Sequence, residues 1–189
     1  TSAYHLTIEP DTLLGRRCAR GELCEIDENL SEEQFAIVHQ RLTSAGYEHY
    51  EISNYALEGY RSRHNSSYWQ GVEYLGIGPA AHSFDGKSRR WSTDTVESYC
   101  EVGEFAFEQE QLSDVEHFNE YVMTRLRTSE GVDLDYVSHR FGRVRAERLR
   151  VAAKPFVGQG IVLLEADALS IKPDSFLLSD MIIEQLIEI

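Results

Sequence analysis

The sequence is poor in cysteine, in positive charge and in long apolar runs. Its 189 residues include three cysteines, and 18 Lys and Arg residues stand against 32 Asp and Glu residues. The spacing of Cys18, Cys24 and Cys100 fits neither a zinc pair nor a redox dithiol, so we expect reduced, unpaired thiols. No apolar run approaches the roughly 20 residues that span a bilayer. These features predict a cytoplasmic protein.

The scarcity of positive charge also bears on nucleic-acid binding. The formal net charge of −14 argues against DNA or RNA as the main partner, because phosphate contacts need clustered Lys and Arg. One local basic cluster exists nevertheless, formed by Arg140, Arg143, Arg145, Arg148 and Arg150. It is either the recognition helix of a winged helix or a solvated face paired with the acidic surplus, and the net charge favours the second interpretation.

The first part of the chain has the pattern of an α/β sheet or barrel. Residues Tyr4–Glu9 alternate as a strand, and Thr12–Asn29 has no sustained period, which predicts a long loop. A capping box at Ser31 predicts the start of a helix that ends at Gly46. Strands are expected at Tyr47–Ser53 and Tyr74–Ile77. A strand, a helix and a strand with a short return predict parallel pairing. Because the chain begins at Thr1 rather than Met and a strand is predicted almost at once, we expect a fragment of a longer protein.

The second part has a winged-helix-like order. A helix is expected from about Asp94, followed by a linker at Gln109–Gln111. A capping box at Ser113 opens the first of three helices, of which the second begins after Asp133. A β-hairpin at Ile161–Lys172 and a final amphipathic helix from Asp174 follow. We therefore predict an α/β fold class with one unit over residues 1–108 and a small α+β winged-helix-like domain over residues 109–189.

The polar segment between the second and third predicted strands holds the sharpest candidate site. His64 is followed by Asn65, Tyr68 and Trp69. An exposed His beside flat aromatic rings suits an axial ligand of haem iron, with Tyr68 and Trp69 stacking on the macrocycle. The alternative is a surface His with two aromatics at a core edge, and on residue types alone that alternative is the commoner case.

Small residues at the end of the third predicted strand form a second candidate site. They let a ligand approach the backbone, but the third glycine of a dinucleotide fingerprint is missing and Pro79 lacks an amide. A tight strand exit packed on a neighbour explains them equally well. Glu51 at the preceding strand end is a candidate for hydrogen bonding to a ligand, or an outward-facing strand residue. The segment comprises Leu75, Gly76, Ile77, Gly78, Ala80 and Ala81.

At these residues the chain resembles a known family. The segments EISNYA, HNSSYW, YLGIGPAAHSF and SRRW look like the C-terminal half of the oxygen-independent coproporphyrinogen III oxidase-like proteins, which are radical S-adenosylmethionine (SAM) proteins. LTIEPDT near the start and GQGIVLLEADALSI near the end extend the resemblance over essentially the whole chain. The HN-x-x-YW stretch is typical of the haem-chaperone branch of this family rather than of the true decarboxylases.

The resemblance implies the C-terminal part of a partial radical SAM (βα) barrel, followed by the winged-helix-like domain. It also implies a 4Fe-4S cluster, SAM and a tetrapyrrole, either haem or coproporphyrinogen. It makes His64 the best candidate haem ligand, with Asn65, Tyr68 and Trp69 shaping its site. The residues expected to face substrate or SAM are Glu51, Asn54, Leu75, Gly76, Ile77, Gly78, Ala80 and Ala81.

The family's C-x-x-x-C-x-x-C cluster ligands and its Gly-rich SAM-binding strand are absent from this sequence. We therefore expect this chain alone to bind no cluster and to leave SAM intact, and cluster absorbance after reconstitution would contradict that. An unpaired barrel edge at Tyr4–Glu9 predicts self-association.

The leading hypothesis is haem binding and delivery to acceptor proteins. The alternatives are a decarboxylase of coproporphyrinogen III and, more weakly, a winged-helix DNA-binding regulator.

Overall fold

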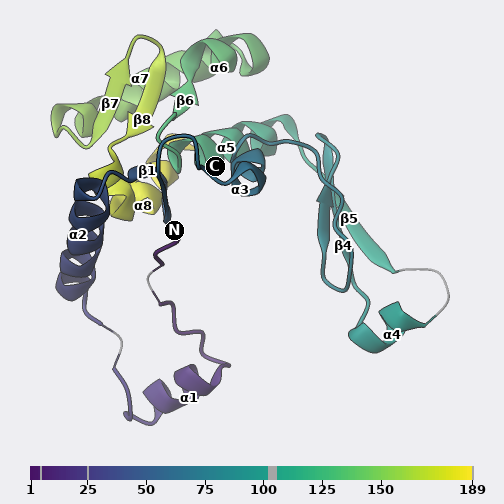
Figure 1. Cartoon of the computed structure of the whole chain (residues 1–189). Helices are drawn as coiled ribbons and strands as arrows, with labels where there is room; N and C mark the ends of the chain where they lie inside the picture. Colours follow the sequence, from purple (N-terminus) through teal and green to yellow (C-terminus); the bar gives the residue numbers. More distant parts are fainter. Residues whose placement is uncertain (5, 25, 102–105, 189) are drawn as a thin grey trace.

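The computed structural model describes residues 1–4, 6–24, 26–101 and 106–188 and shows a mixed α/β protein, as predicted (Figure 1). Its elements are, in order, α1 (Leu13–Ala19), α2 (Glu28–Ser44), β1 (Glu48–Glu51), β2 (Asn54–Ala56), α3 (Arg63–Trp69), β3 (His82–Phe84), β4 (Ser88–Ser92), α4 (Val96–Cys100), β5 (Phe107–Gln111), α5 (Asp114–Leu126), β6 (Val132–Asp133), α6 (Leu134–Phe141), α7 (Arg143–Gly158), β7 (Val162–Glu165), β8 (Ala168–Ile171), the 3-10 helix η1 (Pro173–Leu178) and α8 (Ser179–Leu186). Within the described residues, no helix is long and apolar enough to cross a membrane.

The winged-helix-like order of the second part is confirmed. The Ser113 side chain accepts from the Glu116 amide and the Glu116 side chain accepts from the Ser113 amide, which is the predicted capping box at the start of α5. Asp133 caps α6, and the hairpin β7–β8 joins β6 in an antiparallel sheet of order β6-β8-β7. Phe118, Leu149 and Phe176 are among the fully or almost fully buried side chains of the core that these elements share.

The predicted parallel pairing in the first part is wrong. Among the described residues of Tyr4–Glu9 there is no strand, and only Ser2, which precedes them, forms a bridge, with Asn54. Strand β1 instead pairs with β2 in an antiparallel register. The chain turns at Ile52–Ser53, so the two strands pair locally and need no crossover connection.

Helices also occupy part of the predicted loop at Thr12–Asn29. The Thr12 side chain accepts from the Gly15 amide and caps α1. Asp27 accepts from the Leu30 amide at 2.8 Å and starts α2 one turn before the predicted cap, so Ser31 lies inside the helix. At the other end, Gly46 has a φ of 86°, in agreement with the predicted helix end. Figure 1 shows α1 standing away from the other helices.

The region after α3 forms an antiparallel sheet in place of the predicted third strand. Tyr74 makes a single bridge with Phe84, and β3, β4 and β5 pair in that order. The predicted linker Gln109–Gln111 belongs to β5, and the helix expected from about Asp94 is short; residues 102–105 lie outside the described residues. In Figure 1, β4 and β5 project from the body with α4 near their far end.

Strand β1 and the turn that follows it join the two parts of the chain. The Ile52 amide donates to the Arg127 carbonyl at 2.9 Å and the Ser129 amide donates to the Tyr50 carbonyl at 3.0 Å. Arg61 adds an ion pair to Glu130. The predicted boundary between the two units of the chain, between residues 108 and 109, falls within β5.

Candidate functional site

Helix α3 presents His64 and Tyr68 on one face. Ser62 caps the helix by accepting from the Asn65 amide at 3.3 Å. His64 is exposed, and Tyr68 lies one turn later, with its ring edge-to-face to the imidazole at 5.0 Å between centroids. Tyr68 is itself 43% exposed. The two rings therefore form a small aromatic surface open to a ligand.

The other two residues of the HN-x-x-YW stretch lie differently. Trp69 is half-buried and lines a narrow cleft with Tyr50 and Arg125, toward the second part of the chain. The half-buried Asn65 contributes its backbone amide to the helix cap. The structure thus brings His64 and Tyr68 together and places Trp69 against a neighbouring element.

A hollow of about 460 Å³ lies beside this aromatic surface. Its lining includes Tyr74, whose ring is edge-to-face with that of Tyr68 at 4.9 Å, and Phe84. Leu75 and Arg90 also line it. Among the predicted substrate-facing residues, Leu75 therefore lines this hollow, next to Tyr74, whose ring contacts Tyr68.

The Gly-rich segment borders a second hollow, of about 490 Å³. Gly76, Gly78 and Ala81 line it, together with Trp91 and Tyr99. A Cβ on Gly76 would clash with the His82 carbonyl oxygen, so this close approach of two backbones requires glycine. Ile77 is 81% exposed and Ala80 is exposed in a left-handed turn, with a φ of 57°.

Glu51 and Asn54 belong to a buried polar cluster elsewhere. The Asn54 amide donates to the Glu51 carboxylate, and the Ser2 hydroxyl donates to the Asn54 side-chain oxygen. Burial raises the pKa of Glu51, and the hydrogen bond from Asn54 acts in the opposite direction. Because Glu51 also bridges Thr128, this cluster lies where β1 meets the second part of the chain.

Sequence reasoning missed a pair of histidines. The Nδ1 atoms of His39 on α2 and His49 on β1 lie 3.0 Å apart, and the His49 ring stacks on Tyr55 at 4.0 Å. Burial lowers the pKa of His49 to about 4. Alternation in the predicted strand Tyr47–Ser53 gives no signal for His49, because His49, Tyr50 and Glu51 are all buried, and nothing in the sequence pairs His49 with His39.

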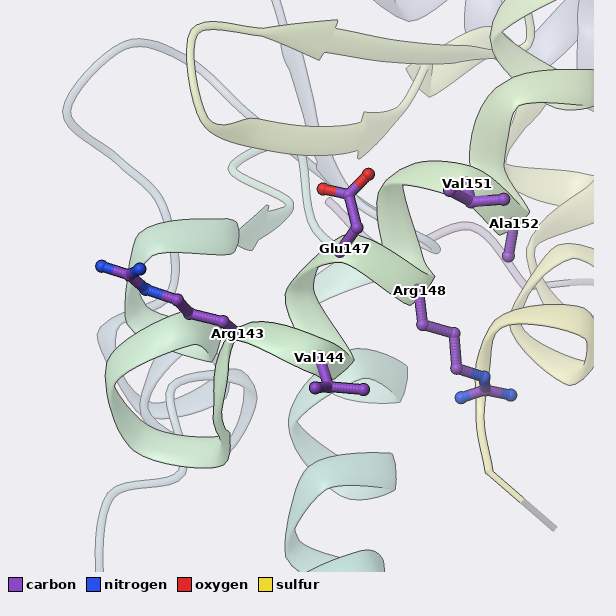
Figure 2. Close-up of a pocket in the computed structure, with 6 residues that line it drawn as sticks. All are labelled: Arg143, Val144, Glu147, Arg148, Val151 and Ala152. Atoms are coloured by element: carbon purple, nitrogen blue, oxygen red, sulfur yellow. The ribbon is translucent and has the colours of Figure 1, made fainter.

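The basic cluster lies on and around α7. Figure 2 shows a hollow there lined by Arg143, Val144, Glu147, Arg148, Val151 and Ala152. Four of the five arginines pair with carboxylates: Arg140 and Arg145 with Asp114, Arg148 with Glu188, and Arg150 with Asp167. This pairing supports the interpretation of a face neutralised by the acidic surplus.

No group of three His, Cys, Asp or Glu side chains that could hold a metal ion occurs in the described part of the chain. Cys18, Cys24 and Cys100 are free thiols. The donor set of a 4Fe-4S cluster is therefore not assembled by these residues.

Comparisons with known proteins give this geometry a context. The HemN C-terminal domain family matches residues 112–178, which begin at the end of β5 and include the three helices and the hairpin. Heme chaperone HemW of Mycobacterium tuberculosis is 32% identical over 98% of this chain and 47% of its own length. Heme chaperone HemW of Bacillus subtilis is 30% identical over 75% of this chain and 38% of its own length. The chain spans about half the length of the curated relatives it matches, or less.

A solved structure shares the fold. It is that of the coproporphyrinogen III oxidase HemN from Escherichia coli, a radical SAM enzyme, and the match covers 89% of this chain and 44% of that enzyme's chain, with a TM-score of 0.63 and 15% identity. The family match and the HemW sequences confirm the predicted resemblance to the C-terminal part of HemN-like proteins. Within that class, the relatives place the similarity in the branch of the HemW heme chaperones.

Proposed function

We propose that this chain binds haem and, as part of a radical SAM protein, delivers it to acceptor proteins. The observation that carries the proposal is the exposed His64 backed by Tyr68, beside a hollow bordered by Tyr74 and Phe84. It occurs in a chain similar to proteins named heme chaperone HemW.

The residues present fit haem as cargo. An accessible imidazole is a suitable axial ligand for haem iron, and aromatic rings offer flat apolar contact with a macrocycle. His64 would bind the iron and Tyr68 would hold the imidazole in place. Arg90, at the border of the same hollow, would offer a cation to a propionate of the tetrapyrrole.

The proposal also includes two cofactors of the intact protein. We propose that a 4Fe-4S cluster and SAM act in the intact protein through residues outside this chain. We also propose a cytoplasmic location, where the three thiols would stay reduced.

A hemin titration followed by visible absorbance tests the proposal. The unmodified chain should give a saturable Soret shift, and His64→Ala should weaken binding by about tenfold or more, because the iron loses its protein ligand. His139→Ala is the matched control, since His139 is an exposed His on α6. Equal binding by His64→Ala and the unmodified chain would refute the proposed site.

A further inference from the structure

The ring of Tyr68 is held between two other rings. Its centroid lies 5.0 Å from the His64 imidazole and 4.9 Å from the Tyr74 ring, and both contacts are edge-to-face. Because Tyr68 is 43% exposed, solvent alone would leave its side chain several orientations. The contact with Tyr74 selects one of them.

Tyr74 itself is fixed by backbone pairing with Phe84, a residue outside α3. Its amide donates to the Phe84 carbonyl and its carbonyl accepts from the Phe84 amide, each at 2.9 Å. The Tyr74 and Phe84 rings also lie close to one another, tilted by 40° with 6.3 Å between their centroids. The edge of the β3–β4–β5 sheet therefore determines where the Tyr74 ring stands.

A charged side chain connects this arrangement to α5. The Arg89 guanidinium lies 5.8 Å from the centre of the Phe84 ring and pairs with Glu120 of α5 at 2.9 Å. Burial opposes the charged form of Arg89, yet the carboxylate of Glu120 and the hydroxyl of Tyr74 raise the pKa of its guanidinium. The second part of the chain thus contacts the aromatic series that ends at His64.

We propose that Tyr74 is a positioning residue for haem binding, acting through Tyr68 on the orientation of the His64 imidazole, and that the Arg89–Glu120 ion pair holds Tyr74 in place. The inference rests on the proposed function, because it concerns the same ligand. It adds a residue outside the HN-x-x-YW stretch and a route by which the winged-helix-like domain controls the site.

Removing the Tyr74 ring tests this role. Tyr74→Ala should raise the hemin dissociation constant about fivefold, the loss expected for one aromatic contact, and change the g-values of the ferric complex in electron paramagnetic resonance. Tyr74→Phe keeps the ring and should restore both the affinity and the spectrum. Tyr60→Ala is the matched control, because Tyr60 is 80% exposed.

Two further variants keep the outcome clear. Glu120→Gln removes the ion pair without touching the aromatic rings and should produce a weaker change of the same kind, even if Tyr74→Ala folds poorly. Tyr68→Phe tests whether a tyrosine oxygen, rather than His64, binds the iron, and we expect an unchanged spectrum.

The results separate the two proposals. If His64→Ala binds hemin normally, the haem site itself is wrong. If His64→Ala loses binding while Tyr74→Ala and Glu120→Gln keep the wild-type affinity and spectrum, the haem site stands and the positioning role is refuted.

Discussion

His49 shows at the scale of one residue how packing sets chemistry. Its ring stacks on Tyr55, meets the edge of Phe176 at 4.9 Å and faces His39 on α2. Burial is the main cause of the lowered pKa of about 4, and the charge of a protonated His39 adds to it. The folded protein therefore holds His49 neutral throughout the physiological range.

This lowered pKa predicts a loss of stability in mild acid. The unfolded chain binds a proton at His49 with a pKa near 6.5, whereas the folded chain does so near 4, so stability is present above about pH 6.5 and is lost as the pH falls toward 4. Between about pH 7.5 and about pH 5.5 the free energy of unfolding should fall by roughly 1 to 1.5 kcal/mol. Urea unfolding at the two pH values measures it.

His49→Gln is the control for that experiment. Glu51, whose pKa is raised by burial, acts in the opposite direction, since a raised carboxyl pKa loses stability as the pH rises. Comparing the chain with His49→Gln cancels this contribution, because Glu51 is common to both. An equally steep pH dependence in His49→Gln would show that another group is responsible.

The candidate site could be predicted from sequence only where its contacts are local. His64 and Tyr68 are four residues apart, so a helix places them on one face, and Trp69 falls on another. Tyr74 could not be assigned to the site, because its position depends on pairing with Phe84, ten residues later. Similarly, Arg89 reaches Glu120 only through the register of β4 and the placement of α5.

At the scale of elements, the sequence predicted helices better than strand partners. The capping box at Ser113 was correct because its donors and acceptors lie within four residues. The cap of α2 was misplaced because Asp27 and Ser31 are both good capping residues, and the helix extends to the earlier one. Strand β1 was recognised, but its antiparallel partner β2 was not, because the turn at Ile52–Ser53 was assigned to the predicted strand itself.

The turn around Gly76 brings two backbone segments close together, and a substitution there tests how much this contact holds the turn. Gly76→Ala places a Cβ against the His82 carbonyl oxygen, so one of the two backbones must move. The hydrogen bond from the Gly76 amide to the Ser83 hydroxyl, 2.9 Å long, should weaken as a result. We expect the Gly76 and Phe84 amides to exchange hydrogen about tenfold faster, measured by nuclear magnetic resonance.

Gly158→Ala provides the matched control for the same substitution type. Gly158 ends α7, and apart from its chain neighbours and the adjacent backbone of its own helix no atom lies within 4 Å of the position of its added Cβ. Alanine there should leave the exchange at Phe84 unchanged and stabilise the helix by up to about 1 kcal/mol. Unchanged exchange in Gly76→Ala would mean that the close approach does not hold this turn.

At the scale of the whole molecule, the winged-helix-like domain has a compact core, while the first 27 residues expose apolar side chains. Tyr4, Leu6 and Leu13 are 71%, 72% and 66% exposed. They belong to the segment that borders, with α2, a hollow of about 1020 Å³ lined by Phe35 and Val38 among others. The predicted strand edge is wrong, but exposed apolar side chains in this segment favour association for a different reason.

We therefore expect this chain to self-associate through its first 27 residues as its concentration rises, as measured by sedimentation velocity. Leu6→Asp combined with Leu13→Asp should hold the chain as a monomer, because two charges would be buried in the contact. Val96→Asp combined with Val144→Asp adds the same charge at residues that are 64% and 84% exposed on α4 and α7, and it should leave association unchanged. Equal suppression by both pairs would indicate general charge repulsion in a chain that already carries a net charge of −14, and a monomer at every concentration would contradict the prediction outright.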